Sequence, residues 1–502
     1  MANGGIIGTV NNPTSSTATG VWQQEEQYEA KVTGTWPQRA LFTTKSARFN
    51  SASSDYMTKS NSSTGSTTKA TISMWVKFSS VLTNQAFWEN YSDGSNYLRL
   101  RYRSDASLAV QVDLSNSTDV LKITTRKFRD TSAWYHIVLA INLADGTQED
   151  KYILYINGVR ETSFSTNNNT ANTSGNYVGG GNGFNFTIGR HPSSDAYYDG
   201  YMSEYVFVDG QNLAPTSFGV ANSSGFWSPI PYTGTFGTNG FNLQFENAAA
   251  LGTDSSPNGN TFTVNNLTSL DQSTDYPKVN FSTLNPLVLI GNTGRTYADG
   301  NLTFNASSNN WTATHSTIGA SKGKWYAEFK VVTLASSTGY GNLGLMGTEG
   351  ITNGNFLDNA NSVGTGLDYR GSAQVALYSG ASTVQNAGVA FAAGAIVGLA
   401  VDMDNKKFYL SQNGTYLTVG GSVGNPTSGS TGTGSLAIPA GIETFLFGLG
   451  GYSTSFKGTW NFGSPSYAIS SGNADANGYG NFEYAVPSGY YSLNTKNLGE
   501  FG

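Results

Sequence analysis

The sequence lacks several features that would point to a particular chemistry. It has no cysteine, so disulfides, thiolate metal ligands and a cysteine nucleophile are all excluded. Charged residues make up 12% of the chain, about half of the ~25% that is usual in globular domains. The net charge is −6 and lysine and arginine form no cluster, so a phosphate backbone would meet no basic surface. We therefore expect no nucleic-acid partner.

Long apolar segments are also missing. No stretch approaches the ~20 consecutive apolar residues that a membrane-spanning helix needs, so no membrane insertion is expected. The first residues, MANGGIIGTV, lack a basic segment followed by a long apolar core, and so do not predict a Sec signal peptide. The sequence therefore predicts a soluble chain that does not use the general export route.

What the sequence does contain favours many short strands. Its 502 residues suffice for two or three domains, each with its own core. The 61 glycines, with abundant Ser, Thr and Asn, disfavour long helices. Aromatic residues reach 13%, which is too many for a disordered chain. The composition predicts an all-β protein.

Two hairpin patterns lie far apart in the chain. Residues Trp134 to Asn142 and Tyr152 to Asn157 alternate apolar and polar side chains, and the tight-turn pairs Asp145-Gly146 and Asn157-Gly158 follow them. The segment Ile396–Gly414, IVGLAVDMDNKKFYLSQNG, repeats this order of strand, acidic turn, aromatic strand and Asn-Gly. We expect these hairpins to be the centres of two antiparallel β-sandwiches of jelly-roll type in tandem.

The first sandwich, expected over residues 41–220, carries an ordered set of recognisable blocks: ARFNSASSDYM, ATISMWVKF, AWYHIVLAIN, KYILYINGV, FTIGR and DGYMSEYVFVDGQNLAP. In this order they resemble the laminin-G/pentraxin-like family of concanavalin A-type sandwiches. The resemblance implies a binding module, often for glycans and sometimes with calcium. No calcium-ligand motif accompanies the blocks, so we expect no cofactor and no metal site.

The rest of the chain divides into three parts. Residues 221–300 are expected to form a connecting segment that is partly β. Residues 301–465 resemble a SPRY domain through GKWYAE, the hairpin VGLAVDMDNKKFYLSQNG and the closing WNFG. That family implies a non-catalytic binding module with its ligands on loops at one end. Residues 466–502 are expected to be a C-terminal tail.

Residues 1–40 differ from the rest in composition. Trp22, Tyr28 and Trp36 are aromatic residues that a free tail would leave in water, so they favour an arm that docks on a partner over a frayed terminus. With the two modules that follow, this arrangement resembles virion appendage proteins of marine bacteriophages. The resemblance implies a virion-docking arm and other virion proteins as partners.

The motifs that suggest catalysis or metal binding lack the context they need. The G-x-S-x-G at Gly420–Gly424 is followed by no segment that could form the required helix. The acids Asp199 and Glu204 are five residues apart, which points them to opposite faces of a strand and away from a glycosidase pair. Asp402 and Asp404 begin like a calcium loop, but lysines follow. His136 is expected to be structural, and we expect no catalytic residues.

Glycan binding needs aromatic rings to stack on sugars, with polar groups to fix hydroxyls. The candidate ligand-binding residues of the first sandwich are Trp88, Tyr91, Tyr197 and Tyr198. Those of the second sandwich are Tyr340, Tyr369, Arg370 and Tyr452. The alternative is that these rings seal the sandwich ends or form a subunit interface.

The interpretation that unites these features is a phage structural protein, a tail fibre, spike or head decoration on the outer surface or tail of the virion. Its expected task is adhesion to a host-surface glycan or other receptor, without enzymatic activity. A homo-oligomer, with a trimer the first candidate, follows from how such appendages are built. A ligand-free packing or scaffold protein is the first alternative. A bacterial surface adhesin and a polysaccharide depolymerase are further ones.

Overall fold

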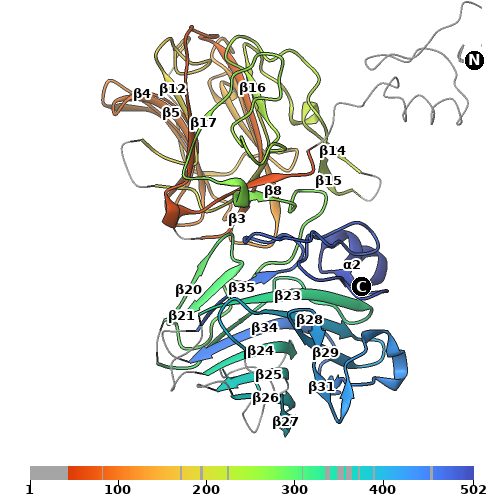
Figure 1. The fold of residues 1–502 in the computed structure, drawn as a ribbon. Coiled ribbons are helices and arrows are strands. Elements are labelled where there is room, and N and C mark those ends of the chain that lie inside the picture. Colours follow the sequence, from red (N-terminus) through yellow and green to blue (C-terminus); the bar gives the residue numbers. More distant parts are fainter. Residues whose placement is uncertain are drawn as a thin grey trace, which may run out of the picture.

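The computed structural model describes most of the chain after the first 42 residues. The described residues are 43–81, 83–169, 172–192, 196–222, 225–307, 309–333, 340–347, 355–357, 364–370, 374–380, 382–387, 391–452 and 456–502. The expected docking arm, with Trp22, Tyr28 and Trp36, lies outside them. Two bodies rich in strands follow one another (Figure 1), and the expected all-β class with tandem sandwiches is confirmed.

The first sandwich has two sheets of eight strands. Sheet 1 consists, in spatial order, of β10 (Val159–Arg160), β9 (Tyr152–Ile156), β8 (Trp134–Asn142), β3 (Lys69–Phe78), β13 (Gly200–Asp209), β1 (Ser46–Phe49) and β18 (Gln272–Ser273), with β16 (Phe241–Leu243) also paired to β13. Sheet 2 consists of β11 (Phe164–Asn169), β7 (Ser117–Thr124), β6 (Leu108–Leu114), β5 (Asn96–Tyr102), β4 (Gln85–Asp93), β12 (Asn185–Ile188), β2 (Tyr56–Ser60) and β17 (Thr263–Asn265).

The central hairpin behaves as its sequence predicts. Ile137, Leu139 and Ile141 point from β8 into the core between the two sheets. The turn after β9 places Asn157 at φ 50° and Gly158 at φ 81°, a backbone region that asparagine and glycine tolerate best. The alternating pattern therefore determines which face of sheet 1 is buried.

The segment 221–300, expected to be a connection, contributes strands to the first sandwich. Strand β16 pairs with β13, β17 with β2 and β18 with β1. Strands β14 (Gly219–Ala221) and β15 (Trp227–Pro229) form a further hairpin. These strands are only two or three residues long, so their apolar side chains produce no periodic signal in the sequence. The part of the segment up to Ser273 is thus built into the first sandwich.

The second sandwich has a sheet of seven strands and a sheet of nine. Sheet 3 consists of β19 (Ile290–Gly291), β22 (Thr312–His315), β34 (Phe445–Tyr452), β24 (Tyr340–Gly347), β25 (Thr365–Arg370), β26 (Gln374–Ser379) and β27 (Ser382–Asn386). Sheet 4 consists of β20 (Arg295–Ala298), β21 (Thr303–Ala306), β35 (Lys457–Asn461), β23 (Lys324–Thr333), β28 (Ile396–Asp402), β29 (Lys407–Gln412) and β30 (Thr415–Tyr416), with β33 (Leu436–Ala437) on β29 and β36 (Tyr491–Ser492) on β23.

The C-terminal tail packs against this second sandwich. Strand β36 runs parallel to β23, and helix α2 (Thr495–Phe501) follows it. Phe482 and Tyr490 of the tail cluster with Tyr326 and Tyr409, which point outward from sheet 4. The tail therefore covers the outer face of sheet 4 (Figure 1). Within the described residues, no helix is both long and apolar enough to span a membrane.

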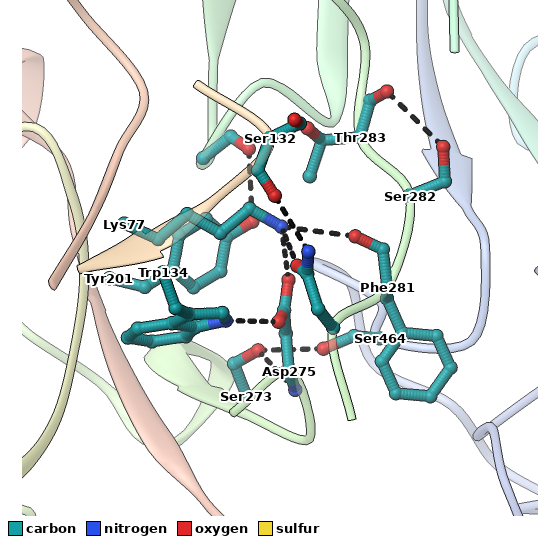
Figure 2. A network of polar contacts seen from close by, with 12 residues as sticks. Lys77, Ser132, Trp134, Tyr201, Ser273, Asp275, Phe281, Ser282, Thr283 and Ser464 are labelled. Carbon is teal, nitrogen blue, oxygen red and sulfur yellow. Dashed lines mark hydrogen bonds and ion pairs between the residues drawn. The ribbon is translucent and has the colours of Figure 1, made fainter. Parts of the chain in front are cut away.

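A buried ion pair lies at the junction of the two sandwiches (Figure 2). The Lys77 ammonium on β3 lies 2.8 Å from Asp275 Oδ2, and the side chains of both residues are 1% exposed. Lys77 also donates to Asn280 Oδ1 at 2.7 Å and to the Phe281 carbonyl at 3.0 Å. Trp134 Nε1 donates to the other Asp275 oxygen at 2.9 Å. Both charges are thus fully hydrogen-bonded, as their burial requires.

Further hydrogen bonds cross the junction. Ser273 and Ser464 place their hydroxyl oxygens 2.7 Å apart, which joins the end of the first sandwich to the chain after β35. Asn301 Nδ2 donates to the Ser79 carbonyl at 2.8 Å. The segment that carries Asp275 is therefore held by both sandwiches.

Removing the charge of Asp275 tests this junction. Asp275→Asn leaves a buried ammonium without its counter-ion, which destabilises a protein by about 3–5 kcal/mol. Asp150 pairs with Arg160 on the surface, where the two side chains are 32% and 42% exposed, so Asp150→Asn as the matched control changes stability by less than about 1 kcal/mol. Urea unfolding measures both variants. Equal stability of the two would show that the junction does not depend on the pair.

Candidate functional site

Two of the predicted ring positions in the first sandwich are wrong as ligand sites. Trp88 is 0% exposed and packs on the rings of Phe186 and Phe207, each at 5.7 Å between centroids. A bulge in the pairing of β4 with β5 between Ala86 and Trp88 interrupts the alternation. Tyr198 is likewise 0% exposed, and its hydroxyl donates to a backbone carbonyl. Neither ring has a face free for a sugar.

The other two predicted rings remain partly exposed. Tyr91 lies on β4, in register with Tyr97 on β5. Tyr197 packs on Tyr56, with 6.3 Å between the ring centroids. The Arg190 guanidinium lies 4.8 Å from the Tyr56 centroid and 5.6 Å from that of Tyr197. Both predicted rings therefore lie beside sheet 2, and they stay candidates for ligand contact.

In the second sandwich the structure brings three of the four predicted residues into one row. Tyr340 on β24 is in register with Arg370 on β25 and with Tyr452 on β34; the side chains of Tyr340 and Arg370 lie outside the described part of the structure. Tyr452 packs on Trp311, with 5.9 Å between centroids. Tyr369 is 5% exposed and belongs to the core, so its prediction as a ligand residue is wrong.

The outer face of sheet 2 differs from those of the other three sheets. Apolar clusters cover the outer faces of sheets 1, 3 and 4, whereas no such cluster among the described residues lies on sheet 2. Polar and aromatic side chains occupy that face instead. We call the following residues the polar face: Glu89, Tyr91, Tyr97, Arg99, Arg101, Gln111 and Asp113.

Strand geometry explains how the polar face forms. In β5 the segment YLRLRY turns Leu98 and Leu100 into the core, so Tyr97, Arg99 and Arg101 point outward because successive side chains alternate. The alternating pattern that predicts a strand over residues 97–102 thus also contains this outward row of one tyrosine and two arginines. The row is the signal from which the polar face could have been found in the sequence.

Most of the polar face is connected by hydrogen bonds. Arg99 donates from Nη2 to Gln111 Oε1 at 2.8 Å, and its guanidinium lies 4.9 Å from the ring centroid of Tyr97. Gln111 Nε2 donates to Asp113 Oδ1 at 2.9 Å, and the Tyr97 hydroxyl donates to the other Asp113 oxygen. These groups hold one another in fixed positions, which is what a preformed binding surface requires.

A buried carboxylate lies beside this network. Glu89 Oε2 is 2.8 Å from His191 Nδ1. Burial raises the pKa of Glu89, while the hydrogen bond with His191 and the charges of Arg99 and Arg101 oppose the rise. The Glu89 carboxylate is therefore stabilised by its hydrogen bond with the His191 imidazole and by the positive charges of the two arginines.

A pocket of about 230 Å³ opens next to these charges. Its lining includes Arg99, Arg101, His191, Asn84 and Ala196. This volume is below the ~300 Å³ at which pockets for drug-sized ligands begin, so it suits a single small group or sugar ring. Burial, followed by the charge of Arg99, lowers the pKa of Arg101 to about 10. The guanidinium still carries its charge at neutral pH.

His136 has the structural role that the sequence predicts. It is fully buried, with its ring stacked 4.7 Å from Trp75. Its Nε2 lies 2.8 Å from the Ser73 hydroxyl, and Trp227 Nε1 donates to its Nδ1 at 2.8 Å. Burial lowers the pKa of His136 to about 3, so the imidazole is neutral. It joins the β14–β15 hairpin to the outer face of sheet 1.

The motifs set aside in the sequence lie in structural roles. Gly420–Gly424 overlaps the short hairpin of β31 (Thr418–Val419) and β32 (Ser422–Val423), and the 3-10 helix Pro426–Thr431 follows it in place of the α-helix that a nucleophile elbow requires. Asp402 pairs with Lys324 at 2.9 Å, and Asp404 accepts from the Gly323 amide. Within the described residues, no three His, Cys, Asp or Glu side chains are grouped to hold a metal ion.

The two acids considered for glycan cleavage have different surroundings. Burial raises the pKa of Asp199 to about 6 and that of Glu204 to about 7. Asp199 accepts from the Ser51 hydroxyl, and Glu204 accepts from the Thr43 amide at 2.8 Å. Asp199 also borders a hollow of about 530 Å³ at the junction. Each carboxylate is thus held by its own neighbours.

A comparison with protein families gives a match within the first sandwich. A family model described as the concanavalin A-like lectin/glucanases superfamily matches residues 51–212. This part of the chain is therefore similar to domains of the concanavalin A-like lectin type. No curated protein matches the sequence of the chain.

Solved structures with similarity to the chain include both kinds of sandwich. The SPRY domain of human HERC1 is 11% identical, covers 36% of this chain and 93% of its own, and has a TM-score of 0.23. A SAP-like pentraxin from Limulus polyphemus is 15% identical, with 32% and 71% covered and a TM-score of 0.24. Domains LG4–5 of the mouse laminin α1 chain are 9% identical, with 84% and 88% covered and a TM-score of 0.29.

The raised pKa of Glu204 predicts a pH-dependent stability. Its pKa is 4.5 before folding and about 7 in the structure, so the folded state holds the proton more tightly and stability falls as pH rises from 4.5 to 7. The loss is about 3 kcal/mol. Glu204→Gln keeps the acceptor for the Thr43 amide but removes this loss. Urea unfolding at pH 5 and pH 8 should show the variant gaining stability relative to the wild type at the higher pH. Parallel pH profiles of the two proteins would contradict the assignment.

Proposed function

We propose that this protein is a non-enzymatic adhesion protein that binds glycan through the polar face of its first sandwich. The observation that carries the proposal is that this outer sheet face is the one without an apolar cover among the described residues. It presents instead a connected set of aromatic, guanidinium and carboxylate groups. Such a set supplies the stacking surfaces and hydrogen-bonding groups that sugar recognition needs. The lectin-type family match supports the same class of function.

We further propose that the protein belongs to a bacteriophage particle, as a tail fibre, spike or head decoration on its outer surface or tail. The support is the order of modules, an N-terminal segment with aromatic residues followed by a laminin G-type and a SPRY-like sandwich. In this proposal residues 1–40 bind other virion proteins, the chain forms a homo-oligomer such as a trimer, and the sandwiches face the host surface. The row of Tyr340, Arg370 and Tyr452 is a second candidate contact surface.

Two other functions predict different surfaces and activities. A packing or scaffold protein would use the polar face as an interface with neighbouring subunits and would bind no glycan. A depolymerase would need a second carboxylate placed across a cleft from an acid such as Asp199. Glu204 is engaged elsewhere, because it lies in the bulge of β13 between Ser203 and Val206 and accepts from the Thr43 amide.

A glycan array probed with the full chain tests the adhesion proposal. Tyr91→Ala and Tyr197→Ala each remove a stacking surface beside sheet 2 and should weaken retention on the bound glycans by about 2- to 10-fold. Phe226→Ala is the matched control, because Phe226 is 72% exposed and lies in the β14–β15 hairpin, away from the polar face. Failure of the wild type to bind any glycan would favour the scaffold. Release of reducing sugar from the bound glycans would favour the depolymerase.

Electron microscopy of the particle tests the virion assignment. We expect residues 1–40 to be ordered against another virion protein while both sandwiches project outward. Their burial in a shell or tube lattice would instead identify a scaffold, and the aromatic residues would then be interface residues. Absence of the chain from purified particles would overturn the assignment to a virion.

A further inference from the structure

Arg101 is the one member of the polar face's arginine pair that forms no hydrogen bond or ion pair with the described residues. Its neighbour Arg99 lies in register between Glu89 and Gln111 and donates to the latter. Within the described part of the chain, Arg101 forms no ion pair, and its Nε atom is buried without a hydrogen-bond acceptor. A buried donor left without an acceptor is unfavourable by about 1–3 kcal/mol, so its presence calls for an explanation.

The residues around Arg101 leave room for a ligand. Its register partners are Ala86 on β4 and Ala109 on β6, whose methyl groups are too short to reach the guanidinium. Ala196 lines the same pocket from the segment after β12. The small side chains of Ala86 and Ala196 thus leave space in the hollow of about 230 Å³ beside the guanidinium.

The acidic groups nearby are already engaged. Both oxygens of Glu89 lie within 3.0 Å of His191 Nδ1. Asp113 accepts from the Tyr97 hydroxyl and from Gln111. Among the described residues, the pocket wall therefore presents two guanidinium groups and no free carboxylate.

We propose that the pocket beside Arg101 binds the oxyanion of an acidic glycan, a uronate carboxylate or a sulfate ester. The guanidinium has parallel N–H groups that match two oxygens of such an anion, which gives both strength and orientation. The adjacent rings of the polar face would then contact the neighbouring sugar units. This inference rests on the proposed function and names the class of glycan for the same site.

Three sugars that differ in one group test the pocket. D-glucuronate, D-glucose 6-sulfate and D-glucose are added to the full chain at matched ionic strength, and the thermal unfolding temperature is measured. A ligand that binds only the folded state raises that temperature. We expect at least one of the two anionic sugars to raise it and glucose to leave it unchanged. The larger of the two shifts identifies the preferred anion.

Variants on one strand separate the pocket from general charge effects. Arg101→Gln should abolish the shift and weaken binding by about 10-fold or more in calorimetry. Arg103→Gln is the matched control, because it removes the same charge two residues away, where Arg103 lies 3.7 Å from Asp105 and does not line the pocket. Arg101→Lys keeps the positive charge but loses the paired N–H groups of the guanidinium, so it should bind with intermediate affinity. This variant keeps the test valid if Arg101→Gln does not fold.

The outcomes separate this inference from the proposed function. Equal shifts of the unfolding temperature in the wild type and Arg101→Gln would overturn anion binding in the pocket. So would the absence of a shift of the wild type with either anionic sugar. A glycan array that retains only neutral glycans, with Arg101→Gln unaffected, would overturn the pocket and leave adhesion standing. An Arg101-dependent shift without retention of any glycan on the array would overturn adhesion and leave the anion site standing.

Discussion

Each sheet of a β-sandwich has two faces, and pairing two sheets covers only one face of each. The other face must be polar or must be covered by another part of the chain, because a large exposed apolar surface would lead to association. In this protein that constraint accounts for several segments outside the two paired sheets. The β14–β15 hairpin brings Trp227 over sheet 1, and the tail brings Phe482 and Tyr490 over sheet 4. Phe356 and Leu357 cover sheet 3 in the same way.

Sheet 2 meets the constraint with polar side chains, and buried polar side chains require hydrogen-bond partners. Groups such as Glu89, Arg99 and Asp113 lose contact with water as they pack side by side, so each needs a partner. Among the described residues, hydrogen bonds meet this demand except at Arg101, which has alanines opposite it on both neighbouring strands and a pocket beside it. The same feature that is unfavourable for the isolated chain is what would make the site respond to an anion.

Alternation in the sequence predicted the elements that obey it. The hairpins around Trp134–Gly158 and Ile396–Gly414 form as expected, because their apolar residues are spaced two apart and their turns carry Asn-Gly. The burial of Trp88 could not be predicted, since the bulge before it depends on the pairing with β5. The segment between Phe241 and Ser273 was expected to be partly β, but its place in the first sandwich was not predicted, because its strands are too short for a period to show.

The candidate site was only partly visible in the sequence for a related reason. Tyr91 and Tyr197 were predicted as single exposed rings, and they do lie beside the polar face. Residues Arg99 and Arg101 were within a predicted strand, but their importance depends on which residues stand opposite them on β4 and β6. Cross-strand neighbours follow from the register, which one strand's sequence does not specify.

The central claim is that ligand binding occurs on the outer face of sheet 2. Hydrogen–deuterium exchange of the full chain, with and without a saturating uronate oligosaccharide, tests it most directly. The account predicts added protection in β4, β5 and the segment around His191, and unchanged exchange in the second sandwich. Protection confined to the ends of β24 and β34, or absent from both sandwiches, would contradict it.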